Sequence, residues 1–438
     1  MKEEFTSIKE AIKKGKGSIA VRGWVHRERG SNKMKFIVLR DASDIIQVVL
    51  QKDKFEKQWG EIDKLQIESS LKIWGKIKKD ERAPTGFEIE ADKIEIVGTS
   101  DSFPINKDLN EELLGDRRHL WIRSRKMSAI MKIRSTVLGA IHEYFRGEGF
   151  YEFQSPMLLS AAGESGSSVF EVDYFGSKMY LAQTWQLHAE AAMFGLEKIY
   201  CIAPSFRAEK SNTSRHLTEY WHAEMEEAWT SFEKLQGHGE ALMKNIVNRV
   251  LEKNIDELKI LERDLKTLKA SASKKFPRMT YTEVLKLLKD KFGMNVPWGK
   301  DLRTIEEDKL SSLHDTPVIV TNYPKAVKAF YMKESPETLK LKEEKKTVQG
   351  FDMIGPEGYG ELIGASQREE NIEVIKENLK KQGEDLKNYE FYFDTRRYGS
   401  IPHGGFGMGV ERVVSWICGL TTIKDAIGFP RTMNRKEP

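Results

Sequence analysis

The stretch FRAEKSNTSRHLTEYWHAEMEEAW, residues 206–229, decides the fold of the larger part of this chain. It combines large aromatic side chains with arginines, histidines and carboxylates, a mixture that suits neither a plain surface nor a plain core. With the two-residue period of a strand, one face carries an aromatic and three polar groups, namely Tyr220, His222, Glu224 and Glu226. The other face carries residues that we expect in the core, namely Trp221, Ala223 and Met225.

The polar face of this strand needs partners, because burying unpaired polar groups costs a few kcal/mol each. A solvated face with salt bridges is one interpretation. The other is the floor of a ligand site, with an anion end at Arg207 and Arg215, an aromatic plate at Tyr220, and a cation or amide end at Glu224 and Glu226. A nucleotide together with an amino acid fits that layout.

A second group of chemical residues lies in FDMIGPEGYGELIGASQRE, residues 351–369. Asp352 and Glu361 offer the carboxylate oxygens that Mg²⁺ prefers beside phosphates. Arg368 is placed to clamp a carboxylate with two hydrogen bonds. A loop with ordinary surface charges is the alternative for this stretch.

A third group lies in RRYGSIPHGGFGMGVERVVSWICG, residues 396–419, where four glycines leave the backbone bare just before a helix. Glycine lets a flat group approach closely. The apolar side of the helix is buried, so we expect Arg412 to point the other way at the helix N-terminus, where anions are favoured. A tightly packed strand–helix corner is the alternative.

The remaining chain narrows the class of protein. It has 438 residues, 39% hydrophobic and 32% charged, which is typical of a soluble protein of two or three domains. No apolar run reaches membrane-spanning length, no signal-peptide pattern is present, and two distant cysteines fit a reducing cytoplasm. The nucleotide signatures G-x-G-x-x-G and G-x-x-x-x-G-K-[ST] are absent, as is C-x-x-C. The formal charge of +4 resides in residues 1–100, which is compatible with a polyanion partner or a solvated surface.

The pattern divides the chain into a small β domain and a larger α+β domain. Five short runs rich in Val, Ile, Phe and Trp between 18 and 98 predict a barrel of the OB type, with a sandwich as the alternative. Residues 101–126 are predicted to be a connector. An amphipathic helix begins near Met127 and is followed by a strand in YEFQSPML. Strands are then predicted across 169–229, 349–365 and 389–408, helices across 231–270, mixed structure across 275–345, and a last helix at 409–419. Together these elements predict that the larger domain is an antiparallel sheet flanked by helices, of the α+β class.

Three pieces in this order resemble the three motifs of the class II aminoacyl-tRNA synthetases: YEFQSPML, FRAE…RHLTEYWHAEME and GFGMGVERVV. The resemblance covers nearly the whole chain. A barrel followed by these motifs looks like the subclass that charges aspartate, asparagine and lysine, and is most similar to archaeal-type asparaginyl-tRNA synthetases. It implies an anticodon-binding domain at 1–100, a hinge at 101–126 and a catalytic domain at 127–438, with 231–345 as a variable insertion. It also implies a cytoplasmic homodimer.

The resemblance assigns an ATP site to Arg207, Ala208, Glu209, Arg215, His216, Leu217, Tyr220, Glu361, Gly409, Val410, Glu411 and Arg412. Arg207 would bind the α-phosphate and the amino-acid carboxylate, and Glu209 the adenine amino group. Arg215 and His216 would contact the outer phosphates, while Tyr220 and Arg412 sandwich the adenine. Arg207, Arg412 and Glu361 would carry catalysis. Glu361 would hold Mg²⁺ together with Asp352.

The amino-acid site implied by the resemblance comprises Glu164, Gln186, Ala189, Arg207, Glu224, Gly364 and Arg368. Glu164 would gate this site. Aspartate-charging relatives have a lysine at the position of Ala189 and a serine at that of Gly364. A buried carboxylate without its cation is costly, so the loss of the lysine favours asparagine as substrate. A non-discriminating aspartyl enzyme, an asparagine-synthetase-like paralogue and an RNA-binding paralogue with a dead catalytic domain are the alternatives.

The barrel carries the expected RNA contacts. Phe36 and Gln47 lie eleven residues apart, which places them on neighbouring strands. In this subclass a phenylalanine and a glutamine at that spacing stack on and hydrogen-bond the central anticodon uridine. Core for Phe36 and surface for Gln47 is the alternative. The expected partners are therefore the tRNA, at its anticodon loop and acceptor end, and asparagine, with no membrane contact.

Overall fold

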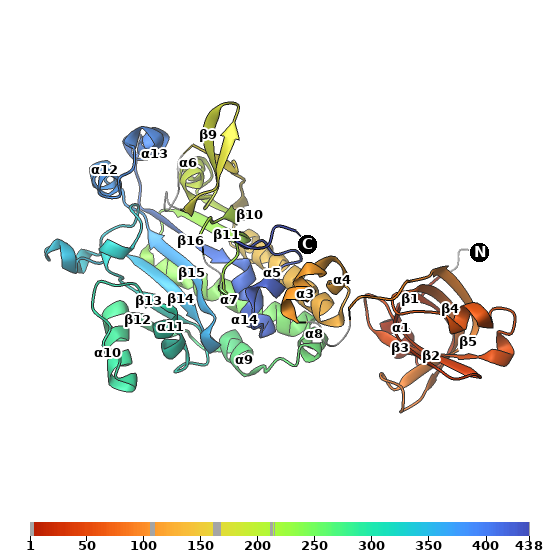
Figure 1. Ribbon diagram of the computed structural model, residues 1–438. Coiled ribbons are helices and arrows are strands. Elements are labelled where there is room, and N and C mark those ends of the chain that lie inside the picture. The colour runs from red at the N-terminus through yellow and green to blue at the C-terminus, as the bar shows by residue number, and fades with distance from the viewer. Residues whose placement is uncertain (1–3, 106–109, 161–167, 211–212, 214, 438) are drawn as a thin grey trace. The chain divides into compact units, whose positions relative to one another are not determined.

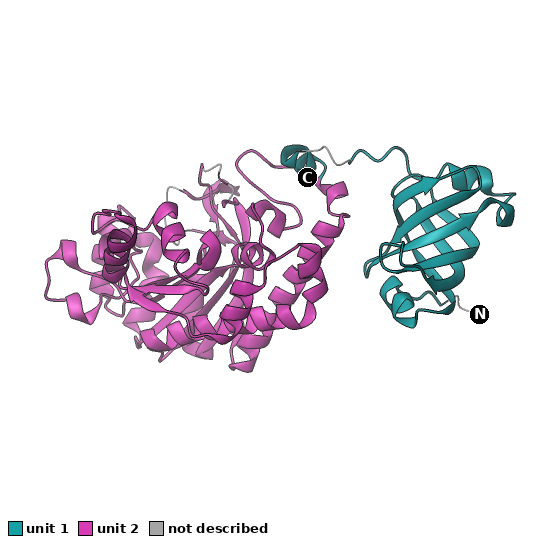
Figure 2. Ribbon diagram, turned by 90° about the horizontal axis from the view of Figure 1, so that it is seen from below, with its two compact units in different colours: residues 1–117 teal, residues 118–438 magenta. Residues whose placement is uncertain are grey.

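The protein is described by a computed structural model that covers residues 4–105, 110–160, 168–210, 213 and 215–437. It forms two compact units, residues 1–117 and 118–438 (Figure 2). The boundary falls within the segment 101–126. None of the helices in the described part of the chain combines the length and apolar character that crossing a bilayer requires.

The first unit is built on a closed five-stranded barrel in the order β1-β2-β3-β5-β4 (Figure 1). Its strands are β1 Gly17–Gly30, β2 Met34–Arg40, β3 Ile45–Gln51, β4 Ser70–Lys79 and β5 Phe87–Gly98. Its helices are α1 Ile8–Lys14, α2 Trp59–Asp63 and α3 Glu111–Asp116. Alternate β-branched and leucine side chains fill the barrel, and Val21, Ile37 and Ile73 are fully buried. The barrel prediction is confirmed over the sandwich.

The second unit contains an eight-stranded sheet in the order β12-β13-β14-β15-β16-β11-β10-β6. Its strands are β12 Arg278–Thr280, β13 Val318–Thr321, β14 Gly350–Gly355, β15 Gly360–Gln367, β16 His403–Gly409, β11 Glu219–Ala228, β10 Lys198–Phe206 and β6 Tyr151–Glu152. The central pairings are antiparallel, whereas β12 and β6 join the two edges in parallel. A smaller sheet comprises β7 Leu158–Leu159, β9 Ser177–Leu181 and β8 Glu171–Tyr174.

Long amphipathic helices cover one face of the large sheet (Figure 1). The helices of this unit are α4 Arg118–Trp121, α5 Arg125–Gly147, α6 Gln186–Leu196, α7 Phe232–Lys253, α8 Ile255–Ile260, α9 Lys266–Ser273, α10 Tyr281–Phe292, α11 Thr304–Ser311, α12 Ile372–Lys381, α13 Glu390–Arg397 and α14 Val410–Cys418. Ser124 caps α5 by accepting from the Met127 amide at 3.2 Å. Side chains of α5, α7 and α14 form one apolar cluster with Met225 and Ala223 of β11. The opposite face of β11 is left for polar side chains.

Four details differ from the sequence predictions. Residues 169–229 contain α6, because QLHAEAAMFGL is rich in good helix formers. Residues 389–408 contain α13, whose Tyr392 and Phe393 pack in an aromatic cluster and gave it the composition of a strand. The strand expected in YEFQSPML is reduced to two residues of β6. Trp221 is not core: its side chain is 38% exposed, although Ala223 and Met225 are buried as predicted.

Candidate active site

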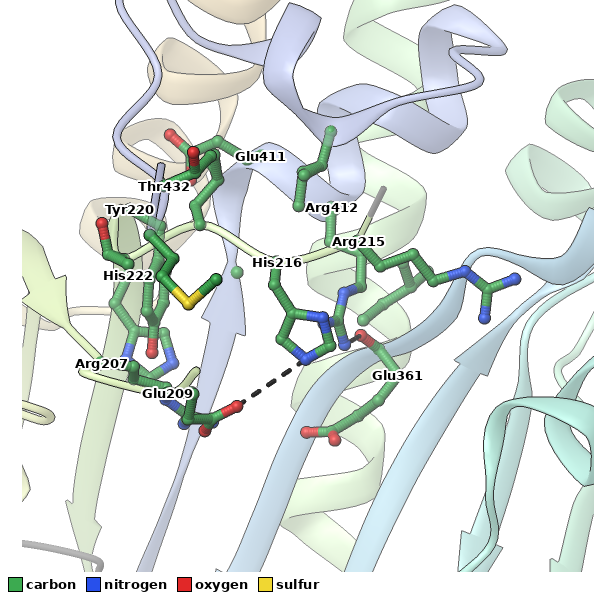
Figure 3. Close-up of a pocket in the computed structure, with 17 residues that line it drawn as sticks. Arg207, Glu209, Arg215, His216, Tyr220, His222, Glu361, Glu411, Arg412 and Thr432 are labelled. Atoms are coloured by element: carbon green, nitrogen blue, oxygen red, sulfur yellow. Dashed lines mark hydrogen bonds and ion pairs between the residues drawn. The ribbon is translucent and has the colours of Figure 1, made fainter. Parts of the chain in front are cut away.

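Two adjoining cavities lie on the polar side of β11. The first, of about 290 Å³, is bounded by residues between β10 and β11, by β11, β15 and β16, by the start of α14, and by Ile423, Thr432 and Met433 (Figure 3). The second, of about 570 Å³, extends toward α6, residues 327–332 and β15. Arg207, His222, Glu361 and Gly407 line both cavities. A ligand with two parts could therefore occupy both, with these four residues at the junction.

Glycines of β16 create the room beneath β11 side chains. A methyl group added to Gly407 would lie 2.4 Å from His222 Nε2, and one added to Gly405 would lie 2.4 Å from a Glu226 carboxylate oxygen. The bare backbone therefore accommodates these two β11 side chains, and not only an incoming flat ligand. His222 and Glu226 therefore lie on the polar face predicted from strand parity, but only His222 lines the cavities, and Glu226 lies behind their wall.

The first cavity is rich in cations. Arg207 lies with its guanidinium carbon 5.8 Å from the centre of the Tyr220 ring. His216 Nε2 is 3.7 Å from a Glu209 oxygen (Figure 3), and burial lowers the pKa of His216. Arg412 donates to the backbone oxygen of Glu361 at 2.7 Å. Such a mixture of guanidinium groups and one aromatic plate suits a phosphate ester attached to a planar base.

Helix α11, from the predicted insertion, reaches the same region. Its Asp308 pairs with Arg215 at 3.0 Å. Burial, followed by the charge of Glu361, raises the pKa of Glu307 to about 7. The segment 231–345, whose role the sequence did not reveal, therefore contributes carboxylates beside the expected phosphate contact Arg215.

Asp352 and Glu361 lie together at the junction of the cavities. A methyl group added to Gly364 would lie 2.6 Å from Glu361 Oε1 and 3.9 Å from Asp352 Oδ1. Lys328 donates to Asp352 Oδ2 at 2.7 Å, and its ammonium lies 3.9 Å from the Tyr323 ring centre. Burial, opposed by Lys328 and assisted by Glu361, raises the pKa of Asp352 to about 6.

These two carboxylates fit a magnesium ion shared with substrate phosphates. Lys328 engages one oxygen of Asp352, and Oδ1 lies on the side of Glu361. Mg²⁺ in nucleotide sites uses one or two carboxylates together with phosphate oxygens and water. Among the described residues, no three His, Cys, Asp or Glu side chains gather in a way that could hold a metal. The donor set therefore suits a phosphate-bridged ion and not an all-protein cage.

The second cavity is lined at its inner end by buried polar groups. Glu224 accepts hydrogen bonds from the Thr184 hydroxyl and, at 2.9 Å, from the Trp185 amide. Burial raises the pKa of Glu224, but His222 and these donors outweigh burial and leave it below its ordinary value. Glu224 is thus an ionised acceptor facing the cavity, a suitable partner for an ammonium or amide N–H.

Arg368 is the cation at this inner end, and it donates to both carboxylate oxygens of Glu226 in a bidentate ion pair. Arg368 also donates to the Ser366 hydroxyl at 2.6 Å. Burial, followed by the charges of Glu190 and Glu224, raises the pKa of Glu226 to about 8 in spite of Arg368. The guanidinium expected to clamp a ligand carboxylate therefore already has a carboxylate partner.

Most of the expected site residues that the structure describes line the two cavities, and three do not. Ala189 is fully buried in an apolar cluster with Trp185 and Met193, and is not among the lining residues. Val410 is buried in the main core, and the Ala208 amide donates to Ser168 O. Glu164 lies outside the described residues.

Comparison with known proteins gives the same family throughout. Residues 110–433 match the family model described as tRNA synthetases class II (D, K and N), and residues 19–97 match an OB-fold nucleic acid binding domain. The chain belongs to the class II tRNA synthetases of the aspartate, lysine and asparagine group. The barrel and the three motifs of this synthetase are therefore a family trait, as their resemblance indicated.

Relatives of this synthetase can be ranked by similarity. It is 46% identical to the asparagine–tRNA ligase of Thermococcus gammatolerans and 44% identical to that of Thermoplasma acidophilum, over 96% of both chains in each case. The asparaginyl-tRNA synthetase of Pyrococcus horikoshii complexed with asparaginyl-adenylate superposes with a TM-score of 0.93 at 42% identity, covering 99% of this chain and 100% of that one. The enzyme of Entamoeba histolytica in complex with the same adenylate gives 0.86 at 29% identity, covering 96% and 97%.

In the synthetase's barrel, β2 and β3 pair so that Val38 faces Gln47 and Phe36 faces Val49. Phe36 is partly exposed, with the Arg29 guanidinium 5.1 Å from its ring centre. Gln47 is buried and donates its amide to Glu88 at 2.8 Å. The two residues thus lie on neighbouring strands, as their spacing predicts, and the register places them on one face.

Sequence reasoning missed several residues of this site. Thr184 stands within QTWQLHAE and could have been found from its place two residues before Gln186. Lys328 and Glu307 lie in the insertion, where no sequence pattern marks them. His222 was placed on the correct face without a role, and it lines both cavities.

Proposed function

We propose that this chain attaches asparagine to its tRNA through an asparaginyl-adenylate. The placement of Arg368 between two buried carboxylates, Glu226 and Glu190, carries the proposal, because the cation at the inner end of the cavity already has carboxylate partners. A neutral amide can enter such a site. An aspartate carboxylate would find no positive charge that is not already paired, so its burial would be costly. The names of the similar archaeal ligases and of the adenylate-bound neighbour support the same choice.

The proposed reaction follows from the shared wall of the two cavities. Arg207 lines both and would hold the α-phosphate of ATP beside the carboxylate of asparagine, which attacks the α-phosphorus in line and releases pyrophosphate. The terminal ribose hydroxyl of the tRNA then attacks the acyl carbon of the adenylate, which forms the ester and releases AMP. Arg207 and Arg412 position the phosphates and balance their charge. Magnesium at Asp352 and Glu361 would supply further charge neutralisation for the leaving pyrophosphate.

Individual roles remain as the resemblance implies. Glu209 would accept from the adenine amino group, and Arg215 and His216 would contact the outer phosphates. Tyr220 and Arg412 would enclose the base. Gln186 and Glu224 would hold the amino acid, and Glu164 would gate its entry.

The barrel would read the anticodon. Phe36 offers a stacking face, and stacking contributes ~1–3 kcal/mol per base. The Gln47 amide nitrogen is held by Glu88, so its carbonyl oxygen is the group that would accept from the N3–H of uracil. The tRNA would thus contact the barrel through its anticodon and the catalytic unit through its acceptor end.

We also expect a cytoplasmic homodimer. The edge strand β6 follows α5 directly and carries Tyr151, whose side chain is 61% exposed. An edge strand presents unpaired backbone groups that can pair with another chain. Both cysteines are free and buried, which fits a reducing compartment. Light scattering of the purified protein tests the dimer.

Amino-acid-dependent ATP–pyrophosphate exchange, followed by charging of purified tRNAs, tests the function. Asparagine should support exchange and aspartate should not, and chelation of Mg²⁺ should abolish the signal. Equal or faster exchange with aspartate would favour a non-discriminating aspartyl enzyme. Exchange with no charging of any tRNA would favour a paralogue that makes free asparagine, and no exchange at all a binding protein.

A further inference from the structure

A buried network lies directly behind the amino-acid cavity, centred on Glu190 of α6. This carboxylate is fully buried and lines neither cavity. It pairs with Arg396 of α13 at 2.6 Å and with His403 Nε2 of β16 at 2.9 Å. The Tyr392 hydroxyl lies 2.9 and 3.0 Å from its two oxygens. The Gln186 side chain, from α6 itself, is the fourth donor to this carboxylate. Donors from α6, α13 and β16 therefore converge on Glu190.

Glu190 contacts the cavity through two residues that do line it. The Gln186 side-chain amide donates to Glu190 Oε1 at 2.8 Å, one helical turn away. With its nitrogen held there, Gln186 presents its carbonyl oxygen as the group left for a ligand. Arg368 Nε lies 3.9 Å from Glu190 Oε1. Glu190 therefore influences both an acceptor and a cation of the cavity wall.

Glu190 is also held in its ionised form at this end of the cavity. Burial alone would raise its pKa, but Arg396 and His403 hold the pKa of Glu190 well below its ordinary value. Glu226, the other carboxylate on Arg368, has a pKa of about 8 and carries its negative charge only in part at neutral pH. Two buried guanidinium groups, Arg368 and Arg396, thus depend on Glu190 for constant compensation.

We propose that Glu190 is a specificity-determining positioning residue, whose charge keeps Arg368 from capturing a carboxylate side chain and whose hydrogen bond fixes the Gln186 amide toward the ligand. The inference rests on the proposed function, because it concerns the choice between asparagine and aspartate in the same cavity. Without Glu190, Arg368 and Arg396 would present excess positive charge, and an aspartate carboxylate would become the compensating group.

Two variants separate the two effects. Glu190→Gln removes the charge, and the ratio of kcat/KM for asparagine to that for aspartate in pyrophosphate exchange should fall about tenfold or more. Glu190→Asp keeps the charge but shortens the reach to Gln186, so the KM for asparagine should rise while the ratio is retained. The KM for ATP should stay unchanged in both.

The chain offers a matched control and a charge-restoring variant. Glu227 is an equally buried carboxylate on β11 that pairs with Lys234 at 2.6 Å and lines neither cavity. Glu227→Gln should leave the asparagine-to-aspartate ratio as in the wild type. Glu190→Gln combined with Arg396→Gln restores the balance of charge and should recover most of the selectivity, even where the single variant folds poorly.

An unchanged ratio in Glu190→Gln, or the same loss in Glu227→Gln, overturns the inference. Failure of the double variant to recover selectivity also contradicts the charge argument. A wild-type protein that exchanges equally with both amino acids overturns the proposed function together with the inference. A selective wild type with an indifferent Glu190→Gln variant overturns the inference alone.

Discussion

Substitution of Gly364 by alanine should separate catalysis from folding in this synthetase. Gly364 lies on β15 between Asp352 of β14 and Gly407 of β16. An added methyl group would lie 2.6 Å from Glu361 Oε1 and 3.6 Å from its carboxyl carbon. The obstructing atoms belong to the end of a flexible side chain and not to backbone, so the chain can fold with the methyl group present.

The expected magnitude follows from this overlap. Non-bonded atoms separate to about 3.5 Å, so the Glu361 carboxylate must retreat by about 0.9 Å. A misplacement of about 1 Å in a positioned group can reduce a rate about 10²-fold, which corresponds to ~2.7 kcal/mol of transition-state stabilisation. We therefore expect kcat for asparagine-dependent exchange to fall about 100-fold. The KM for asparagine should change little, because Glu224 and Arg368 are not displaced.

The unfolding free energy should stay within about 1 kcal/mol of the wild-type value, since alanine in place of glycine restricts the unfolded chain. Gly195→Ala in α6 is the matched control, because a methyl group there meets no atom within 4 Å. It should exchange at the wild-type rate. A Gly364→Ala enzyme with kcat within threefold of wild type would refute the placement of Glu361 at the phosphates.

Other perturbations have distinct expected outcomes. Gly405→Ala should unfold or strongly destabilise the catalytic unit, measured by thermal denaturation, because its methyl group would lie 2.1 Å from the backbone oxygen of Met225. The ratio of kcat/KM for asparagine to that for aspartate should increase between pH 7 and 9, because Glu226, with its pKa of about 8, loses its proton beside Arg368. Since folding raises this pKa, the contribution of Glu226 to the free energy of unfolding is lost as the pH rises through that value. Phe36→Ala should weaken tRNA charging roughly tenfold or more and leave asparagine-dependent exchange intact; equal loss in both assays would make Phe36 structural only.

The linear motifs allowed much of the site to be predicted. Arg207, Glu209 and Tyr220 lie within one strand–loop–strand, and Arg412 follows the glycine strand at once, so strand parity and helix phase place them. The barrel was predictable for the same reason, since short alternating strands leave a local signal. Trp221 was misplaced because parity gives the face of a strand but not how far a neighbour covers it.

The parts that the sequence could not predict depend on elements distant in the chain. Lys328 follows a short turn at 325–327, beyond the end of β13, and no sequence pattern indicates that it donates to Asp352 of β14. Helix α13 reads as a strand from its aromatic residues, and tertiary packing overrides that preference. Such contacts have no local periodicity, so only the assembled sheet shows them.

The two ends of the site differ in how their charges are held, and this difference has a functional reason. At the nucleotide end, the side chains of Arg207, His216 and Glu209 are each more than a third exposed, and Arg215 is a third exposed. Such charges can move to accept phosphates and release pyrophosphate. At the amino-acid end, Glu190, Glu226 and Arg368 are buried, and both carboxylates pair with Arg368. These buried side chains are fixed in place and their charges are already paired. They discriminate an amide from a carboxylate, because a ligand charge would be buried where the side chains cannot move to compensate it. Selectivity in this synthetase should therefore respond most to substitutions behind the cavity wall, and turnover most to those at its exposed rim.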